Sequence, residues 1–314
     1  MRTLHGEAPG RGGHCQGAAR ASAEGLALKL RLIANPVSGG DARPRIARAA
    51  ALLRAGGAEV EVCLTQARGD ARRLAAQARD GGFDRVVAAG GDGTLNEVAN
   101  GLCGAPVPVA FLPLGTVNVF ALETGIPLEL EPACRLAVEG RPRRISLGRI
   151  GDECFLLMAS AGWDAAAVAR LRPAVKRRIG RLAYGVAALE VLLAGPPPAI
   201  AATLADGSRR SGYGVVVSNA RCYGGTYVVT PAASLESPFL EVCLFKRGGR
   251  LAMLGYALRL ALHRPLLPPA VEFCRVERVE LAGAGVPVQV DGDAWGTLPV
   301  VVSCQAEALA VVLP

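Results

Sequence analysis

The stretch RVVAAGGDGTLNEVANGL, residues 85–102, has the pattern of a strand, a turn and a helix in succession. Its apolar start, Arg85–Ala89, predicts a buried strand. Apolar residues between Leu95 and Leu102 then recur at the i, i+3, i+4 and i+7 positions of a helix. A glycine-rich turn separates the two. This order is typical of an α/β domain built on a parallel sheet.

The same alternation continues on both sides of this stretch, and continuous apolar strands are typical of a parallel sheet buried on both faces. Residues 28–140 are therefore predicted to form a doubly wound α/β domain with a parallel sheet. The expected strands are Lys29–Asn35, Ala58–Leu64, Arg85–Ala89 and Val109–Pro113, and the expected helices are Pro44–Ala55, Asp70–Arg79 and Thr94–Leu102.

Residues 141–314 carry shorter strands separated by turn residues, with helical interruptions around 163–194 and 250–264. This pattern predicts a mostly antiparallel β-sandwich domain. Whether its last strands lie in this domain or return to the first stays open. Residues 1–27 are rich in Gly, Ala and Arg, and predict a disordered extension. The expected strands are Arg143–Ile150, Phe155–Ala159, Ile200–Leu204, Tyr213–Ser218, Leu240–Phe245, Val271–Leu281, Val286–Val290, Val300–Cys304 and Ala308–Leu313.

The composition excludes several classes of protein. With 314 residues, 51% of them hydrophobic, the chain is long and apolar enough for two cores, which excludes a disordered or fibrous protein. Its apolar runs fall short of the about 20 residues that a membrane-spanning helix needs. The nine cysteines are scattered and there are three histidines, so neither a disulfide framework nor a zinc site is expected. These features favour a cytoplasmic protein.

Three glycine-containing loops follow predicted strands: NPVSGG (35–40), GGDGT (90–94) and LGTVN (114–118). The carboxyl ends of parallel strands share one edge of the sheet, which is where open α/β sheets bind ligands. Glycine lets backbone N–H groups approach a phosphate, and helix N-termini add positive potential. The loops therefore predict a nucleotide polyphosphate site.

Other phosphate motifs are absent: there is no GxxxxGK[ST] and no GxGxxG, and the chain has three lysines. Phosphate charge is therefore left to backbone donors, arginines and Mg²⁺. A purely structural alternative stays open, because Thr94 and Glu97 have the spacing of a capping box and Asp92 alone could be an N-cap.

Together with PLGTVNVFALETGIP (113–127) and QVDGDAWG (289–296), these loops resemble the diacylglycerol kinase catalytic-domain family. This family includes bacterial lipid kinases and sphingosine kinases, with NAD kinases as distant relatives. The resemblance implies a nucleotide-binding domain and a β-sandwich domain with the active site in the cleft between them. It also implies phosphorylation of a lipid hydroxyl by ATP with Mg²⁺, with diacylglycerol first and sphingoid or related lipids next.

Carried over residue by residue, the resemblance makes Asp293, the last residue of DGD, the acid that takes the substrate proton. Asp291 and Asp92 join it as candidate catalytic residues. Because Asp291 and Asp293 stand two apart, they could face the same way, so that one serves as general base with its pKa raised by the other. The candidate nucleotide-binding residues are Asn35, Ser38, Gly39, Thr65, Gly90, Gly91, Asp92, Gly93, Thr94, Asn96, Glu97, Thr116 and Asn118.

The chain departs from the family pattern at three places. The family's DGE reads DGD here, and Val119 stands where an Asp often follows the Asn of the GTxN motif. In the segment Pro231–Leu240, Ser237 replaces the aspartate that binds a structural Mg²⁺ in bacterial relatives. Ser237 is therefore the one candidate metal residue, and that site is weakened.

Basic residues stand beside apolar helical segments at two places. Arg250–Arg264 carries leucines at helical spacing beside Arg259, and an anionic lipid surface would attract such a segment. A solvated basic face over an ordinary core helix is the alternative. The other run precedes Leu182–Ala194 and contains Arg170, Arg172, Lys176, Arg177, Arg178 and Arg181.

The sequence thus predicts a lipid kinase of phospholipid metabolism, a transferase acting on an alcohol group, peripheral to the inner face of the membrane. Its expected partner is the lipid substrate at that surface. No nucleic-acid partner is expected, because aromatic platforms are scarce, and a homodimer stays open. The alternatives are an NAD kinase-like enzyme with a soluble substrate, or a nucleotide- or lipid-binding sensor with little turnover.

Overall fold

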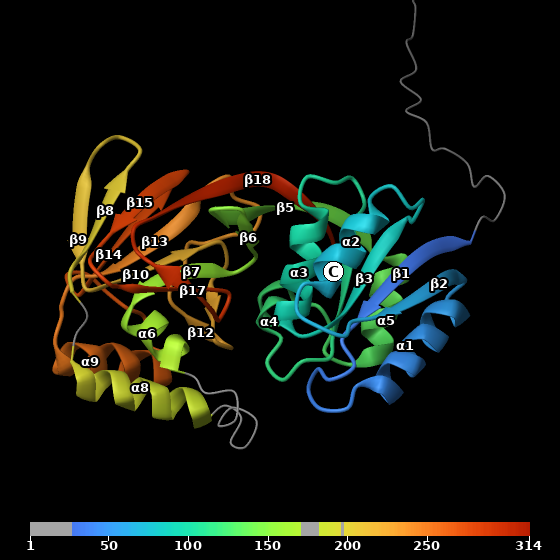
Figure 1. The fold of residues 1–314 in the computed structure, drawn as a ribbon, viewed down its shortest axis with the longest axis horizontal. Helices are drawn as coiled ribbons and strands as arrows, with labels where there is room; N and C mark the ends of the chain where they lie inside the picture. Colours follow the sequence, from blue (N-terminus) through green and yellow to red (C-terminus); the bar gives the residue numbers. More distant parts are fainter. Residues whose placement is uncertain (1–26, 171–181, 196–197) are drawn as a thin grey trace, which may run out of the picture.

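The computed structural model describes residues 27–170, 182–195 and 198–314, and Figure 1 shows two lobes. The first lobe contains four parallel strands in the order β2-β1-β3-β4. This arrangement confirms the predicted parallel sheet. The strands are β1 (Leu28–Ala34), β2 (Ala58–Leu64), β3 (Arg85–Gly90) and β4 (Val109–Pro113).

Helices cover both faces of this sheet. Apolar residues of α1 and α5 pack in one buried cluster with Leu30, Leu32 and Val87, and those of α2 and α3 pack in another with Ile33 and Val86. Alternate strand residues therefore face opposite helical layers, as a doubly wound fold requires. The helices are α1 (Arg43–Ala55), α2 (Asp70–Ala78), α3 (Asp92–Leu102), α4 (Val119–Thr124) and α5 (Leu130–Glu139).

The second lobe is a β-sandwich, also as predicted. One layer is a six-stranded antiparallel sheet in the order β14-β13-β10-β7-β16-β17. Buried residues of this layer pack in one cluster with residues of β8, β15 and β18 from the other sheet. The strands of the six-stranded sheet are β7 (Met158–Gly162), β10 (Gly214–Ser218), β13 (Leu240–Phe245), β14 (Val271–Val276), β16 (Pro287–Val290) and β17 (Asp293–Thr297).

One long strand, β18 (Val300–Leu313), runs through both lobes (Figure 1). It pairs in parallel with β4 and antiparallel with β5 (Arg141–Ile150) and β15 (Arg278–Ala282). The ten-stranded sheet is therefore continuous between the lobes, and the domain boundary at residue 140 stays a prediction. The sheet also contains β6 (Glu153–Phe155), β8 (Ile200–Leu204) and β9 (Arg209–Gly212).

Three strand predictions were wrong. The strand expected over Phe155–Ala159 covers the end of β6 and the start of β7, which belong to different sheets. The single strand expected over Val271–Leu281 is two strands, β14 and β15, which belong to different sheets. Conversely, the two strands expected over Val300–Cys304 and Ala308–Leu313 form the single strand β18. The residues between them lie at a shift in its pairing register with β5, between Gln305 and Leu309. The remaining elements are α6 (Trp163–Arg170), α8 (Leu182–Ala194), α9 (Arg250–Ala261), β11 (Cys222–Tyr223) and β12 (Tyr227–Val228).

Of the basic run before α8, only Arg170 belongs to the described residues, and the predicted extension lies outside them except for Ala27. Within the described ranges, no helix combines the length and apolar character needed to cross a bilayer.

Candidate active site between the lobes

The three glycine loops touch one another at the carboxyl edge of the parallel sheet. A Cβ added to Gly115 would lie 2.6 Å from the Cα of Gly91, and one added to Gly39 would lie 2.5 Å from the carbonyl oxygen of Leu114. Side chains at these positions would push the loops apart. The structure therefore confirms that the loops meet at one edge, and it explains their glycines by backbone-to-backbone packing.

Polar side chains line the base of this loop cluster. Ser38 and Thr94 are buried, and Asn35 donates a long hydrogen bond of 3.5 Å to the Thr94 hydroxyl. Arg45 donates to the carbonyl of Ser38 at 2.8 Å, and so places a guanidinium at the first loop. A Cβ on Gly93, by contrast, would meet no atom within 4 Å, so packing does not require that glycine and the surface above it is open.

The other two threonines expected at the nucleotide, Thr65 and Thr116, lie at the same edge. Thr116 is exposed on the third loop. Thr65 follows β2 directly, and its backbone N–H donates to the carbonyl of Ala34 at the end of β1. The sheet edge therefore brings Thr65 beside the first loop.

Asp92 holds the third loop in place. Its two carboxylate oxygens accept the backbone N–H groups of Val119 and Phe120, each at 2.9 Å, and so cap the start of α4. Burial raises the pKa of Asp92, while these bonds act against the rise. The sequence made Asp92 a candidate catalytic and nucleotide-binding residue. The contacts make it a positioning residue for the loop.

Asn118 is also directed inward. Its side-chain oxygen accepts the N–H of Gly115 at 3.0 Å, and its amide donates to the carbonyl of the same residue at 3.0 Å. The backbone has a φ of 56°, a left-handed conformation that asparagine tolerates better than most residues. Asn118 therefore closes the turn instead of facing a ligand.

Glu97 does not form the capping box. Its carboxylate accepts the N–H groups of Gly69 at 3.0 Å and Ala71 at 3.1 Å, which lie at the start of the neighbouring helix α2. The helix α3 itself begins at Asp92, earlier than expected. Glu97 thus joins α3 to α2 and fixes the segment after β2.

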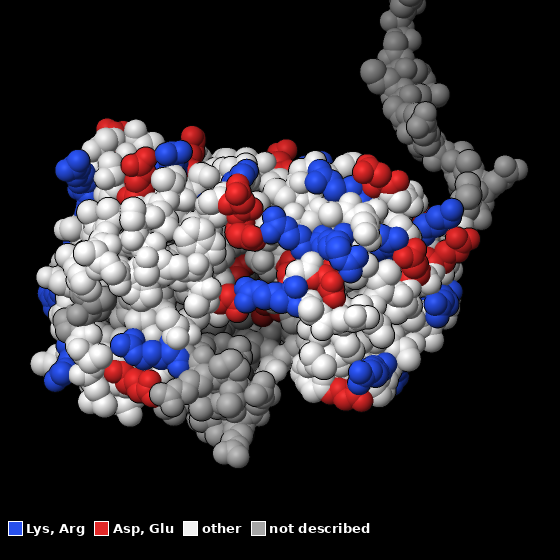
Figure 2. Space-filling view, viewed as in Figure 1, with Lys and Arg blue, Asp and Glu red and all other residues white. Residues whose placement is uncertain are grey.

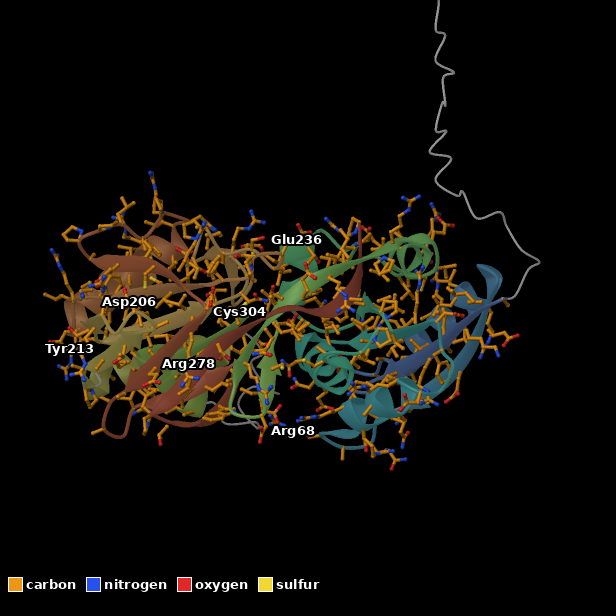
Figure 3. All side chains as sticks on the ribbon, turned by 90° about the horizontal axis from the view of Figure 1, so that it is seen from above. Arg68, Asp206, Tyr213, Glu236, Arg278 and Cys304 are labelled. Carbon is orange, nitrogen blue, oxygen red and sulfur yellow. The ribbon has the colours of Figure 1, made fainter. Side chains whose placement is uncertain are left out.

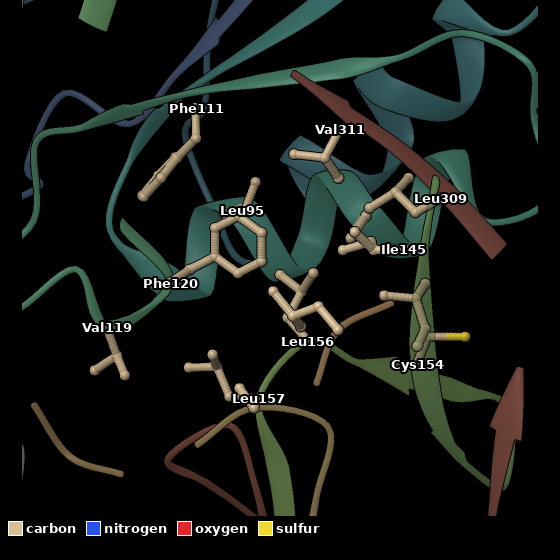
Figure 4. Close-up of a cluster of buried hydrophobic side chains, with 14 of the residues drawn as sticks. Leu95, Phe111, Val119, Phe120, Ile145, Cys154, Leu156, Leu157, Leu309 and Val311 are labelled. Carbon is tan, nitrogen blue, oxygen red and sulfur yellow. The ribbon is translucent and has the colours of Figure 1, made fainter. Parts of the chain in front are cut away.

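The outer face of α3 contacts the second lobe. Asn100 donates to the carbonyl of Cys154 at 2.8 Å and accepts the N–H of the same residue at 2.8 Å. One turn earlier, Asn96 donates to Asp291 at 2.8 Å. Behind these polar contacts lies an apolar cluster that includes Leu95 and Leu156 (Figure 4). The helix that opens with the second glycine loop is therefore fixed to the opposite lobe.

Asp291 accepts four hydrogen bonds. One oxygen accepts from Asn96 and the N–H of Leu156, each at 2.8 Å, and the other accepts from the N–H groups of Leu157 and Met158 at 3.0 and 2.9 Å. These donors occupy about all the lone pairs of a carboxylate. The contacts therefore give Asp291 a positioning role.

Burial raises the pKa of Asp291 to about 6, against the effect of its donors. From the sequence, a raised pKa in this pair was expected to come from the neighbouring carboxylate of Asp293. That expectation was wrong, because burial is the cause. The Asp293 side chain is 61% exposed and pairs with Arg68 at 3.0 Å. The two carboxylates of the DGD turn thus occupy separate environments.

Asp293 points across the gap between the lobes. Its partner Arg68 lies between β2 and α2, on the edge of the sheet that carries the glycine loops, and Figure 3 shows Arg68 where the lobes meet. A second pair, Arg72 with Glu153 at 2.7 Å, crosses the same gap. Figure 2 shows the surface hollowed there, with charged side chains at the rim. Asp293 is therefore the candidate acid at the sheet edge that carries the loop cluster.

The sequence analysis did not predict a series of buried polar groups that are hydrogen-bonded to one another behind the DGD turn, called the polar chain below. The N–H of Gly292 donates to Gln289 at 2.7 Å, and Gln289 donates to Ser160 at 2.7 Å. Ser160 in turn donates to Asp164, which also accepts from the Tyr223 hydroxyl at 3.0 Å. Gln289 lies within the quoted QVDGD motif, but no spacing indicated Ser160, Asp164 or Arg68.

The segment Pro231–Leu240, for which the sequence predicted a weakened Mg²⁺ site at Ser237, does not fit that ion. The Ser237 hydroxyl accepts the N–H of Phe239 at 3.1 Å. The carboxylates near a cavity of about 400 Å³ beside this segment are already paired, Glu236 with Arg143 and Glu123 with Arg221. Across the described ranges, no three His, Cys, Asp or Glu side chains group as metal ligands.

Comparison with known proteins agrees with this geometry. The diacylglycerol kinase catalytic domain matches residues 29–150, and the YegS C-terminal NAD kinase beta sandwich-like domain matches residues 158–313. A "probable lipid kinase YegS-like" of Chromohalobacter salexigens is 30% identical over 256 residues, which cover 80% of this chain and 82% of the relative. A protein of the same description from Pseudomonas putida is 36% identical over 206 residues, covering 61% and 66%.

Among solved structures, a "putative diacylglycerol kinase" of Bacillus anthracis superposes with a TM-score of 0.79 over 93% of this chain and 97% of that one. Its sequence identity is 19%, so this likeness establishes the fold. The two matched domains and the relative from Chromohalobacter salexigens establish the family. The chain therefore belongs to the family of lipid kinases that join a diacylglycerol kinase catalytic domain to a YegS-type C-terminal domain.

Proposed function

We propose that this lipid kinase transfers the γ-phosphate of ATP to a lipid hydroxyl, with diacylglycerol as the first candidate. The observation that carries the proposal is the position of Asp293. It extends from the second lobe toward the sheet edge where three glycine loops meet, and pairs there with Arg68. Phosphoryl transfer needs positioned phosphates on one side and an oriented hydroxyl on the other.

On the nucleotide side, the open surface above Gly93 and the first turn of α3 supply backbone N–H groups to the phosphates. Asp92 and Asn118 keep the third loop against the second. Mg²⁺ bound to ATP would neutralise phosphate charge. The carboxylates of Asp92 and Asp291 accept N–H groups, so they are not available as ligands for a separate ion. We therefore propose that Mg²⁺ enters the site bound to ATP.

On the lipid side, Asp293 is proposed as the general base. An exposed carboxylate can accept the proton of an attacking hydroxyl, whereas Asp291 has no lone pair left for it. Asp291 and the chain through Gln289 hold the DGD turn from both sides. The role of these buried groups is to aim Asp293 at the loop cluster.

The test is transfer of ³²P from γ-labelled ATP with Mg²⁺ to diacylglycerol in mixed micelles, to a sphingoid base and to NAD, in parallel. Label in diacylglycerol supports the proposal, and label in the sphingoid base corrects the substrate. Label in NAD alone would favour the soluble-substrate alternative. ATP binding without label in any acceptor would favour a sensor.

Gly39→Ala is expected to raise the dissociation constant of ATP by about 10- to 100-fold, because the new Cβ would displace the third loop by about 1 Å. Its backbone has a φ of 64° and its Cβ would meet Leu114 at 2.5 Å. Gly40→Ala is the matched control: its φ is 107°, but its Cβ would meet nothing within 4 Å. Equilibrium binding of ATP measures both. Equal effects of the two substitutions would contradict loop packing as the cause.

The kinase is expected to lose activity as the pH falls through about 6. The pKa of Asp291 is raised to about 6 in the folded protein, from about 3.9 in an unfolded chain. Protonation replaces an acceptor with an O–H group and releases one of the four donors, which loosens the DGD turn. A pH profile of kcat/KM measures this effect, and a flat profile between pH 5 and 7 would contradict it.

The same group has the opposite effect on stability. Because its pKa is higher in the folded state, the folded protein binds the proton more readily between about pH 4 and 6. The contribution of Asp291 to the free energy of unfolding therefore falls as the pH rises through this window, and is constant above it. Urea unfolding at several pH values separates the loss of activity from unfolding.

A further inference from the structure

The second lobe exposes a row of leucines on α9. Leu251, Leu254 and Leu258 follow at i, i+3 and i+7, so they share one side of the helix, and Leu262 extends the row beyond its end. Leu251 is 86% exposed and the others are between 52% and 61% exposed. On the opposite side, Met253 and Tyr256 are buried. The helix therefore packs by one side and presents large apolar side chains on the other.

Helix α8 adds to this surface. Its Leu189 and Leu193, one turn apart, are 56% and 64% exposed. The two helices lie side by side at the outside of the second lobe (Figure 1), and Arg250 at the start of α9 donates to the carbonyl of Leu193 at 2.7 Å. We define the leucine face as Leu189, Leu193, Leu251, Leu254, Leu258 and Leu262.

The charge around the leucine face is basic. Between residues 246 and 271 there are five Lys and Arg residues and no Asp or Glu. Of these, Arg247, Arg250, Arg259 and Arg264 are exposed, and Glu190 is the exposed acid on α8. Exposed leucines bordered by arginines fit an anionic lipid surface, which accepts apolar side chains and attracts cations.

A second copy of the chain fits this surface less well. A symmetric dimer would place the same face on both partners, so its arginines would approach those of the other copy. An anionic bilayer instead offers opposite charge to every one of them. Charge complementarity therefore selects the bilayer.

The leucine face also adjoins an apolar cavity. At the end of α9, a cavity of about 150 Å³ is lined by Leu260 and Leu266 on one side and by Val228 and Val229 on the other. The hairpin that contains Val228 also carries Tyr223, which donates to Asp164 in the polar chain behind the DGD turn. Within the second lobe, the leucine face is thus linked through this cavity and hairpin to the polar chain behind the DGD turn.

We propose that the leucine face is the surface by which this enzyme docks on an anionic bilayer. The proposal rests on the proposed function, since it concerns how the enzyme reaches a lipid substrate. In the docked enzyme, the leucines insert among the acyl chains and the bordering arginines contact the headgroups.

Cosedimentation with vesicles tests the proposal, using phosphatidylcholine alone and phosphatidylcholine mixed with phosphatidylglycerol. The variant is Leu251→Ser with Leu254→Ser and Leu258→Ser. The matched control is Leu64→Ser with Leu128→Ser, because those leucines are also about half exposed but lie on the first lobe. Wild type and control are expected to bind the anionic vesicles, and the leucine-face variant at least tenfold more weakly. Unchanged binding of that variant would overturn the proposal.

The charge contribution has its own variant, Arg259→Gln with Arg264→Gln. It should weaken binding to anionic vesicles and reduce the dependence of binding on salt, because fewer charges face the headgroups. Sedimentation equilibrium tests the alternative occupant. A wild-type dimer that becomes a monomer in the leucine-face variant would overturn the proposal in favour of a second copy.

A short-chain, water-dispersed diacylglycerol separates this proposal from the proposed function. The leucine-face variant should phosphorylate it at the wild-type rate, yet lose activity on diacylglycerol in anionic vesicles. Loss of activity on both substrates would contradict a docking role. If the wild type phosphorylates neither but still binds vesicles through its leucines, the proposed function fails and the docking surface stands.

Discussion

Asp293→Asn should lower kcat by about 10²- to 10⁴-fold, the range that a positioned general base contributes. The asparagine keeps the size of the side chain but cannot accept the proton of the attacking hydroxyl. Because Asp293 is exposed and its ion pair with Arg68 is at the surface, the fold should be unaffected. Initial rates of ³²P transfer at saturating ATP measure the effect, and urea unfolding checks the fold.

Two further substitutions make this result specific. Asp152→Asn removes a fully exposed aspartate elsewhere on the second lobe and should leave kcat unchanged. Asp293→Glu restores the acid that the DGE pattern of the family carries, and should retain activity. Near wild-type turnover in Asp293→Asn would show that the base lies elsewhere.

Asp291→Asn should lower the free energy of unfolding by about 1–3 kcal/mol, because the NH₂ group that replaces one carboxylate oxygen leaves at least one backbone N–H without its acceptor. The four donors come from α3 and from residues 156–158 at the entry to β7, so the loss affects the contact between the lobes. Urea unfolding measures the change.

The control for Asp291→Asn is again Asp152→Asn, for which a change within about 0.5 kcal/mol is expected at an exposed site. A free energy of unfolding close to the wild-type value for Asp291→Asn would mean that the four contacts do not hold the turn. In that case, contacts other than those of Asp291 would have to fix the orientation of Asp293.

The sequence was sufficient for the architecture of the first lobe, because its signals are local. Apolar runs and helical spacing identified the strands and the main helices, and glycines marked the loops that meet at the sheet edge. The second lobe gave weaker signals. Residues 271–281 contain no glycine, proline or asparagine near Glu277, where the chain leaves one sheet for the other, so no turn residue marks the break between β14 and β15.

The partners of the acidic residues could not be predicted, because they come from distant parts of the chain. Glu97 is spaced as a capping residue for its own helix, yet it binds the start of α2. Asp291 lies two residues from Asp293, yet its donors are on α3 and before β7. Spacing identifies carboxylates that could converge, but packing determines which of them are occupied by backbone donors.

The position of β18 has a consequence for biosynthesis. This strand lies between β4 and β15 in the ten-stranded sheet, although it is the last strand of the chain. During translation, β4 and β15 therefore emerge with unpaired edges that only residues 300–313 can cover. Neither half of the nascent protein can complete its sheet until those residues have left the ribosome, and the open edges are sites for chaperone binding or misassembly in the meantime.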